Sequence, residues 1–478
     1  MSAPNELSAL DATFLELEQA DPSAHMHIGG ILCFEPRPSG ATPSVAEVAE
    51  VLGSRLSGLP RYRQRLSEQT TGGLDWPRWD DDPRFEISRH IRRAQLPGRG
   101  TRDDLLEWAG EYFSERLDRS RPLWELVVIS GLEGGAWAMA SKTHHCLVDG
   151  VGSVDTVHLM LDAEPEPVPR DVHAAPAEGA PRPQRGRELP GSAILRLPAR
   201  AAAAGIGLLR AGAGTATHPS RAREALQRSR ALVDVLVRDE VIAAPRTSIN
   251  EPIGGRRRLA VLEIELEELK RIKRALGGTI NDVVLAAAGG GFRELLIARG
   301  EELPRQGMRA MVPVNIRSAG EHLGLGNRIT SLFVNLPLAE PDPERRYAQQ
   351  LEEAETLKSG DQALGASAIL DLTGHAPPVI HGFIARSLFA TRMFNVTITN
   401  VPGPQQPLYA FGSKLLSVWP LVPLAAEHSI GIAIFSYDGR AFFAVNADRD
   451  SVPDLDLFVD AIGTSILQLS HAAGATAG

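Results

Sequence analysis

The feature of this sequence that most constrains its fold is a strand–turn–strand pattern leading directly into a pair of histidines. Residues 124–129 and 137–143 are apolar runs typical of strands, and the two glycines at 134–135 predict a tight turn between them. The second strand ends in residues 143–150, which read THHCLVDG. Apolar residues then follow at helical spacing up to residue 161. The histidines are therefore expected at the mouth of a strand, with a helix behind them.

The order HHxxxDG brings together residue types that suit proton transfer. A neutral imidazole accepts a proton from a hydroxyl readily near neutral pH, because its unperturbed pKa is about 6.5. The carboxylate of Asp149 is close enough in sequence to orient such a ring or to hold its loop. Gly150 lets the chain turn from loop into helix without a Cβ clash. We therefore expect a proton-transfer site at His144 or His145.

The composition excludes several classes of protein. A chain of 478 residues is too long for one ordinary core, so two or more domains are expected. Its 43% hydrophobic and 23% charged residues are typical of a folded protein, and its net charge of −9 does not suggest a nucleic-acid partner. Cys33 and Cys146 make no disulfide framework, which favours a reducing compartment. Neither a signal peptide nor a membrane-spanning helix is predicted.

Changes in composition predict the domain organisation. Residues 164–190 are crowded with Pro, Ala, Arg and Gly, which is typical of an exposed linker. Residues 192–246 are rich in Ala, Leu and Arg and are expected to be helical, with breaks at proline and glycine. We therefore predict an N-terminal domain over 1–162, a linker and helical crossover over 163–247, a C-terminal domain over 248–470 and a tail over 471–478.

The expected C-terminal domain contains clear local signals. A helix should end at Gly277, and the next should begin at Thr279, with Asp282 completing a capping box. The glycines 289–291 cost that helix roughly 1 kcal/mol each relative to alanine, which indicates close backbone packing or a bend lining a cavity. The Asp438–Gly439 pair predicts a hairpin turn. Strands are expected over 259–266, 308–314, 331–336, 395–400, 429–437 and 440–446.

A series of motifs along the chain resembles the bacterial wax ester synthase/diacylglycerol acyltransferase family. HHxxxDG alone is shared with peptide-synthetase condensation domains and other acyltransferases, so the resemblance depends on the whole series, which spans nearly the full length. The motifs are LSALDATF at 7–14, HMHIGG at 25–30, DRSRPLWE at 118–125, THHCLVDG at 143–150, the stretch 250–258, NDVVLA at 281–286, PVNIR at 313–317, GN at 326–327 and NVPGP at 400–404.

This resemblance implies two chloramphenicol-acetyltransferase-like α/β domains, joined by a long helical crossover and enclosing a tunnel. Fatty acyl-CoA would enter from one side as a substrate, no cofactor would be needed, and the acceptor alcohol would enter from the other side. The second histidine of the motif, His145, would be the general base, and Asn281 is a candidate to line the active site near the oxyanion. Residues 425–428, AAEH, replace the family's usual glycine-containing approach to the following strand, which leaves the acceptor least defined.

The expected function is transfer of a fatty acyl group to diacylglycerol, giving triacylglycerol. No GxSxG elbow is present, so no covalent acyl-enzyme is expected. A long-chain fatty alcohol as acceptor, giving wax esters, is the alternative within the family. A catalytically silent lipid-droplet-binding protein and a condensation-type enzyme acting on carrier-bound thioesters are alternatives from other classes. The protein is expected in the cytoplasm at a membrane or lipid-droplet surface, where the arginine-bearing stretch 193–213 lies either on lipid or in solvent.

Each motif residue also has a structural explanation. His144 is expected to pack against the core, and Asp149 to brace its loop by pairing with an arginine, Arg317 being one candidate. Metal ligation by His144, His145 and Asp149 is disfavoured, because neighbouring histidines on a strand alternate in direction and no further cluster supplies a third ligand. Cys146 is expected to be a small buried residue, since neither a base nor an orienting group for it is visible.

Overall fold

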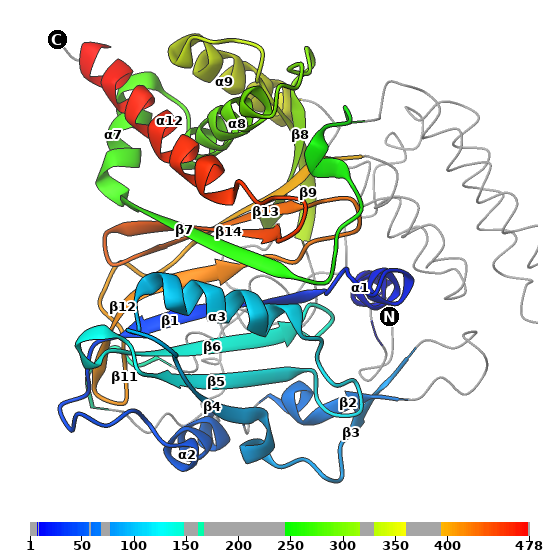
Figure 1. Cartoon of the computed structure of the whole chain (residues 1–478), viewed down its shortest axis with the longest axis vertical. Helices are drawn as coiled ribbons and strands as arrows, with labels where there is room; N and C mark the ends of the chain where they lie inside the picture. Colours follow the sequence, from blue (N-terminus) through cyan, green and yellow to red (C-terminus); the bar gives the residue numbers. More distant parts are fainter. Residues whose placement is uncertain are drawn as a thin grey trace, which may run out of the picture.

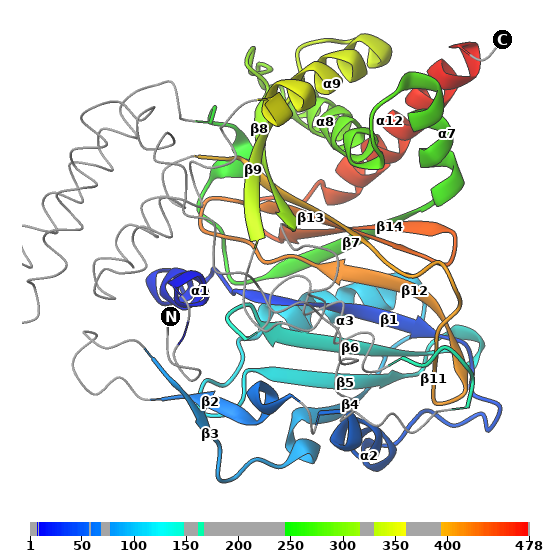
Figure 2. The same cartoon turned by 180° about the vertical axis from the view of Figure 1, so that it is seen from behind.

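Two six-stranded sheets form the framework of the chain. The computed structural model describes residues 7, 9–56, 59–67, 77–147, 161–166, 244–315, 329–359 and 393–476. The first sheet has the strand order β11-β12-β1-β6-β5-β4, and the second has the order β7-β14-β13-β10-β8-β9. In Figures 1 and 2 the first sheet occupies the lower half of the molecule, and a group of helices lies above the second sheet, away from the first.

The first sheet takes strands from both ends of the sequence. Its members are β1 (His27–Phe34), β4 (Ile91–Gln95), β5 (Trp124–Ser130), β6 (Trp137–His144), β11 (Tyr409–Ala410) and β12 (Ser413–Leu421). The predicted strands at 124–129 and 137–143 are confirmed as β5 and β6. β1 pairs antiparallel with β6 on one side and with β12 on the other, and its register sets His27 opposite His144. The expected C-terminal domain therefore contributes β11 and β12 to the sheet of the N-terminal one.

Helix α3 joins the two halves of the molecule. It spans Arg102–Ser114, begins with a capping box between Thr101 and Asp104, and packs against β7 of the second sheet. A Cβ at Gly110 would lie 2.7 Å from the Arg257 carbonyl oxygen, so only glycine permits this approach. The remaining elements of this half are α1 (Ala9–Ala20), α2 (Val45–Leu56), η1 (Pro60–Arg63), β2 (Gln64–Leu66), β3 (Trp79–Asp81), η2 (Ile87–His90) and η3 (Glu133–Gly135).

The second sheet follows the predicted strands closely. Its members are β7 (Arg257–Glu265), β8 (Met308–Asn315), β9 (Ile329–Leu336), β10 (Val396–Pro402), β13 (Ile430–Tyr437) and β14 (Arg440–Asp448). At the turn between β13 and β14, Asp438 and Gly439 have φ values of 44° and 80°. Positive φ at both central residues is the geometry of a tight hairpin turn, as the sequence predicted.

Among the helices above the second sheet, the predicted helix end at Gly277 and helix start at Thr279 are confirmed. These helices are α7 (Leu266–Leu276), α8 (Ile280–Ala298), α9 (Pro343–Ser359) and α12 (Leu455–Thr476), and η6 (Ser248–Asn250) precedes the sheet. Both bonds of the predicted capping box between Thr279 and Asp282 are present at the start of α8. Two of the glycines in α8 serve close packing, because a Cβ would lie 2.2 Å from the Ser465 hydroxyl of α12 at Gly290 and 2.7 Å from Ile462 Cγ1 at Gly291.

Several predicted segments lie outside the described residues. These are the helix expected after the motif and nearly all of the linker and crossover over 163–247. The domain boundaries therefore stay a prediction, as does the tunnel. Within the described ranges, no helix is both long and apolar enough to span a membrane.

Candidate functional site

His145 lies immediately after the last residue of β6, between the strand end and helix α1. Its backbone N–H donates to the Met26 carbonyl at 2.8 Å, which holds the main chain against the residue before β1. Its ring stacks on Phe14 of α1, with the ring centroids 3.9 Å apart and the planes 18° from parallel. The strand end thus holds the backbone of His145, and the helix limits the orientation of its ring.

The surroundings of His145 keep its imidazole neutral. Burial lowers the pKa of His145 to about 4, its own backbone carbonyl opposes this shift, and the neighbouring His144 adds to it. Nδ1 is buried and has no hydrogen-bond partner of ordinary geometry within the described part of the chain. The side chain as a whole is only partly buried, which leaves Nε2 as the nitrogen that can reach a substrate.

His144 is buried, as predicted, but its neighbours are polar rather than apolar. Its side chain is 1% exposed, and its Nδ1 accepts a hydrogen bond from the Cys146 N–H at 3.1 Å. The Leu147 N–H donates to the His144 carbonyl at 2.9 Å and closes a turn around the motif. On the other side of the ring, Nε2 lies 3.5 Å from a carboxylate oxygen of Glu18.

Glu18 is the centre of a buried cluster of charges beneath the motif. Its side chain is 2% exposed, and one oxygen, Oε2, accepts from Arg119 Nε at 3.1 Å and lies 3.2 Å from Arg116. The other oxygen lies 3.6 Å from His27. Burial alone would raise the pKa of the Glu18 carboxyl, but the contact with His144 and the charges of Arg119 and His27 lower it well below its usual range. Glu18 is therefore a carboxylate at neutral pH.

Sequence reasoning missed the contribution of α1 to this site. Phe14 and Glu18 are four residues apart, so they share one face of the helix, and that face meets His145 and His144 respectively. The sequence does contain a signal, because a glutamate at helical spacing from apolar residues falls on a face expected to be buried. Nothing in the sequence, however, indicates what that carboxylate contacts.

The remaining residues of the HHxxxDG motif and of the other sequence motifs have mixed outcomes. Asp149 and Gly150 lie outside the described residues, as does Arg317, so their predicted roles stay predictions. Cys146 is 3% exposed, and burial raises the pKa of its thiol well above the usual value. A protonated, buried thiol is a packing residue rather than a nucleophile, as expected. Trp124 is buried as well, and its indole N–H donates to the Tyr62 carbonyl at 2.8 Å.

The structure does not place Asn281 beside His145. Asn281 lies in the first turn of α8, which packs against α7, α9 and α12 on the side of the second sheet turned away from the first (Figures 1 and 2). The neighbouring Asp282 accepts hydrogen bonds from the Thr279 N–H at 2.8 Å and hydroxyl at 2.7 Å. No described hydrogen bond links Asn281 to His145, so its role at the oxyanion stays a prediction.

The 425–428 loop, which departs from the family pattern, lies next to α1. Ala425 packs with Phe14 against a small apolar cluster that is separate from the two main cores. Both ring nitrogens of His428 face backbone carbonyls, that of Ala426 at 2.6 Å and that of Phe394 at 3.0 Å. The loop is therefore anchored at one end by His428, and at the other end Ala425 packs against the same apolar cluster as Phe14, the stacking partner of His145.

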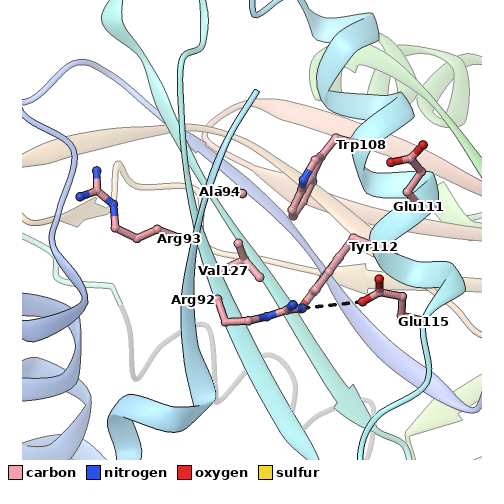
Figure 3. Close-up of a pocket in the computed structure, with 8 residues that line it drawn as sticks. All are labelled: Arg92, Arg93, Ala94, Trp108, Glu111, Tyr112, Glu115 and Val127. Carbon is pink, nitrogen blue, oxygen red and sulfur yellow. Dashed lines mark ion pairs between the residues drawn. The ribbon is translucent and has the colours of Figure 1, made fainter. Parts of the chain in front are cut away.

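A pocket elsewhere on the first sheet is separate from this site. It lies between β4 and α3, and it is lined by Trp108, Tyr112 and Arg92, the last of which pairs with Glu115 at 3.9 Å (Figure 3). Its cavity of about 180 Å³ is smaller than the roughly 300–1,000 Å³ typical of ligand sites.

In the described ranges, no group of three or more His, Cys, Asp or Glu side chains could hold a metal ion.

Comparisons with known sequences identify the relatives of this chain. Residues 7–284 match the wax ester synthase/diacylglycerol acyltransferase catalytic domain, and residues 325–470 match the C-terminal domain of the same family. A probable diacylglycerol O-acyltransferase of Mycobacterium tuberculosis, tgs2, is 33% identical over 468 residues, covering 97% of this chain and 98% of the relative. A second, tgs1, is 30% identical over 473 residues, covering 97% of this chain and 96% of the relative.

Solved structures with the same fold include an enzyme and several condensation domains. The wax ester synthase/diacylglycerol acyltransferase from Marinobacter aquaeolei VT8 is 25% identical, with a TM-score of 0.67 over 98% of this chain and all of that one. The first condensation domain of the CDA synthetase is 17% identical, with a TM-score of 0.56 over 97% of this chain and 96% of that one. These neighbours confirm the predicted fold class, an α/β fold of the chloramphenicol acetyltransferase type.

Proposed function

Because this chain belongs to the wax ester synthase/diacylglycerol acyltransferase family, we propose that it transfers the acyl group of a fatty acyl-CoA to diacylglycerol, giving triacylglycerol. That it is an acyltransferase follows from the family and from relatives matched over nearly the whole chain. The acyl donor, the acceptor and the base are the proposed parts.

In the proposed reaction, His145 is the general base. Neutral Nε2 takes the proton of the acceptor hydroxyl as its oxygen attacks the thioester carbonyl. The tetrahedral intermediate then collapses, the C–S bond breaks, and the proton passes from the imidazolium to the CoA thiolate. The products are an ester and free CoA, and His145 returns to its neutral form. Proton transfer by a positioned side chain contributes about 10²–10⁴-fold in rate.

The observation that supports this proposal best is the environment of His145. Stacking on Phe14 and the bond to Met26 hold the ring and its backbone, and burial keeps the pKa near 4, so the ring is unprotonated at pH 7. The lowered pKa makes the base weaker but ensures that nearly every molecule is in the form able to accept a proton. Close positioning of the two substrates must then supply much of the remaining rate.

The test is a competition assay in which palmitoyl-CoA is offered with diacylglycerol and hexadecanol together. Triacylglycerol formed by the wild type and reduced at least about 100-fold by His145→Ala would support both the acceptor and the base. His471→Ala is the matched control, because His471 is an exposed histidine near the end of α12. An unchanged rate in His145→Ala would refute the role of His145 as base, and the absence of both products would refute the proposed reaction.

Wax ester as the main product would keep the mechanism and change the acceptor. The Marinobacter aquaeolei protein is named for both activities. We propose that acceptor preference is set by the 425–428 loop, whose Ala425 packs against the same cluster as Phe14. Since diacylglycerol is insoluble in water, we also propose that the protein works at a membrane or lipid-droplet surface. Co-sedimentation with diacylglycerol-containing vesicles would test that association, and a protein that stays in the supernatant would refute it.

A further inference from the structure

The position of Glu18 calls for an explanation beyond helix packing. A carboxylate that is 2% exposed loses most of its hydration, and such a group is tolerated only where several donors replace the water. Arg119 and Arg116 supply two of these donors, both directed at Oε2. His144 approaches the same oxygen at 3.5 Å, longer than the roughly 2.9 Å of an ordinary N–H···O bond.

The hydrogen bonds of His144 determine which of its nitrogens is protonated. Nδ1 accepts the Cys146 N–H, so in the neutral ring Nδ1 has no hydrogen and Nε2 must have one. His144 Nε2 is buried and has no hydrogen-bond partner within 3.5 Å of good geometry among the described residues. The Glu18 carboxylate lies beside it, with Oε2 at 3.5 Å. A negative charge there favours the Nε2–H form of the ring over the alternative.

The Nε2–H form of His144 matters for the neighbouring His145. Only this form leaves Nδ1 free to accept the Cys146 N–H, and that bond, with the bond from Leu147 N–H to the His144 carbonyl, closes the turn in which His145 lies. If His144 were protonated on Nδ1, the Cys146 N–H would face a second donor and the turn would open.

We propose that Glu18 is a positioning residue for acyl transfer: it holds His144 in the Nε2–H form and thereby fixes the turn that presents His145. Arg116 and Arg119 keep the Glu18 carboxylate in place. Helix α1 thus positions both histidines, His144 through a charge and His145 through the stacked ring of Phe14. This proposal rests on the proposed function only for its kinetic test.

A structural measurement tests the proposal without any assay of activity. Long-range ¹H–¹⁵N correlation spectra of the ¹⁵N-histidine-labelled protein distinguish the two neutral forms of each ring, and a His144→Asn variant identifies the His144 signals. We expect His144 in the Nε2–H form in the wild type, and a mixture of forms in Glu18→Gln. A wild-type His144 protonated on Nδ1, or a spectrum unchanged by Glu18→Gln, would overturn the proposal.

Kinetics separate a positioning role from a purely structural one. Glu18→Gln should lower kcat roughly 10–100-fold, the range found for groups that orient metal-binding histidines, with little change in the KM for acyl-CoA. Glu115→Gln is the matched control, because it removes a carboxylate that is 69% exposed, just before Arg116. The melting temperature of each variant shows whether the fold is retained.

A double-mutant cycle shows whether Glu18 acts through His144. In the His144→Asn background, Glu18→Gln should lower kcat no further, because the group that it positions is absent. If the kcat of the double variant is reduced by the product of the two single-variant reductions, Glu18 acts independently of His144 and the proposal is overturned. Failure of the proposed function appears differently, as wild-type protein without product or as full activity in His145→Ala, and it leaves the spectroscopic result intact.

Discussion

The three adjacent glycines of α8 predict opposite effects for the same substitution. A Cβ at Gly289 would meet its nearest atom, on Leu336, at 3.7 Å, which is ordinary contact. A Cβ at Gly290 would lie 2.2 Å from Ser465 Oγ and 2.7 Å from its Cβ, and one at Gly291 would lie 2.7 Å from Ile462 Cγ1. Alanine should therefore fit at the first position and force α8 away from α12 at the other two.

The expected magnitudes follow from two opposing terms. Replacing a mid-helix glycine by alanine stabilises the helix by about 1 kcal/mol at all three positions. Overpacking a filled interface costs about 1–3 kcal/mol, and it applies only at Gly290 and Gly291. Gly289→Ala should thus stabilise the protein by about 1 kcal/mol. Because the helix term is common to all three variants, the difference between Gly289→Ala and either neighbour measures the overpacking term itself.

Urea denaturation followed by circular dichroism, with a common slope for all variants, measures these differences. Ser465→Gly should remove the cost of Gly290→Ala, since it deletes the two atoms that the new methyl group would meet, but it should not rescue Gly291→Ala. A Gly289→Ala variant as unstable as Gly290→Ala would refute the packing of α8 on α12 as the reason for these glycines.

Three further predictions concern charge. The pH profile of kcat/KM for the wild type should show an acid limb with an apparent pKa near 4 rather than 6.5, because burial lowers the pKa of His145 to about 4. Rapid pH-jump assays measure this profile, and an acid limb near 6.5 would contradict the prediction. The pKa of His25 is also lowered to about 4 by burial, so the unfolded chain binds protons that the folded chain does not. The free energy of unfolding should therefore have its full value above about pH 6.5. As the pH drops towards 4, it should fall by up to about 1.4 kcal/mol per pH unit for each such histidine. Urea midpoints at several pH values would show this fall. Lys142→Met should cost about 3–5 kcal/mol, because the ammonium is fully buried, pairs with Glu125 at 3.0 Å and binds the last carbonyls of α3. Arg92→Met, at a side chain that is 51% exposed, should cost less than about 1 kcal/mol in the same measurement.

The elements that could be predicted from sequence are those whose signals are local. The capping box of Thr279 and Asp282 lies within four residues, and the Asp438–Gly439 turn lies within two; both are confirmed. For the α8 glycines, close packing was one of two predicted explanations, the other being a bend lining a cavity, and it holds for Gly290 and Gly291. Short-range geometry determines the capping box and the hairpin turn before any tertiary contact forms.

The features that could not be predicted depend on contacts between distant parts of the chain. β12 pairs with β1 in a register that joins Gly29 to Leu421, and no local pattern in either segment indicates the other. Glu18 is similar, since its helical spacing predicts burial but its partners come from β6 and from the loop after α3. The HHxxxDG motif could therefore be located from sequence, whereas the groups that hold its histidines in place could not.

Because β12 of the C-terminal half pairs with β1 of the N-terminal half, the proposed site depends on both halves of the molecule. β12 lies beside β1, and β1 sets His27 opposite His144, so the sheet that ends in the motif is complete only when the C-terminal segment has paired with it. The same dependence recurs at the ring of His145, because Phe14, its stacking partner, packs against the same small apolar cluster as Ala425 from the loop before β13. A change in that loop therefore reaches His145 through this cluster and the ring of Phe14. The segment that we propose sets the acceptor preference thus also affects the orientation of the base, so substitutions there should alter kcat together with acceptor choice.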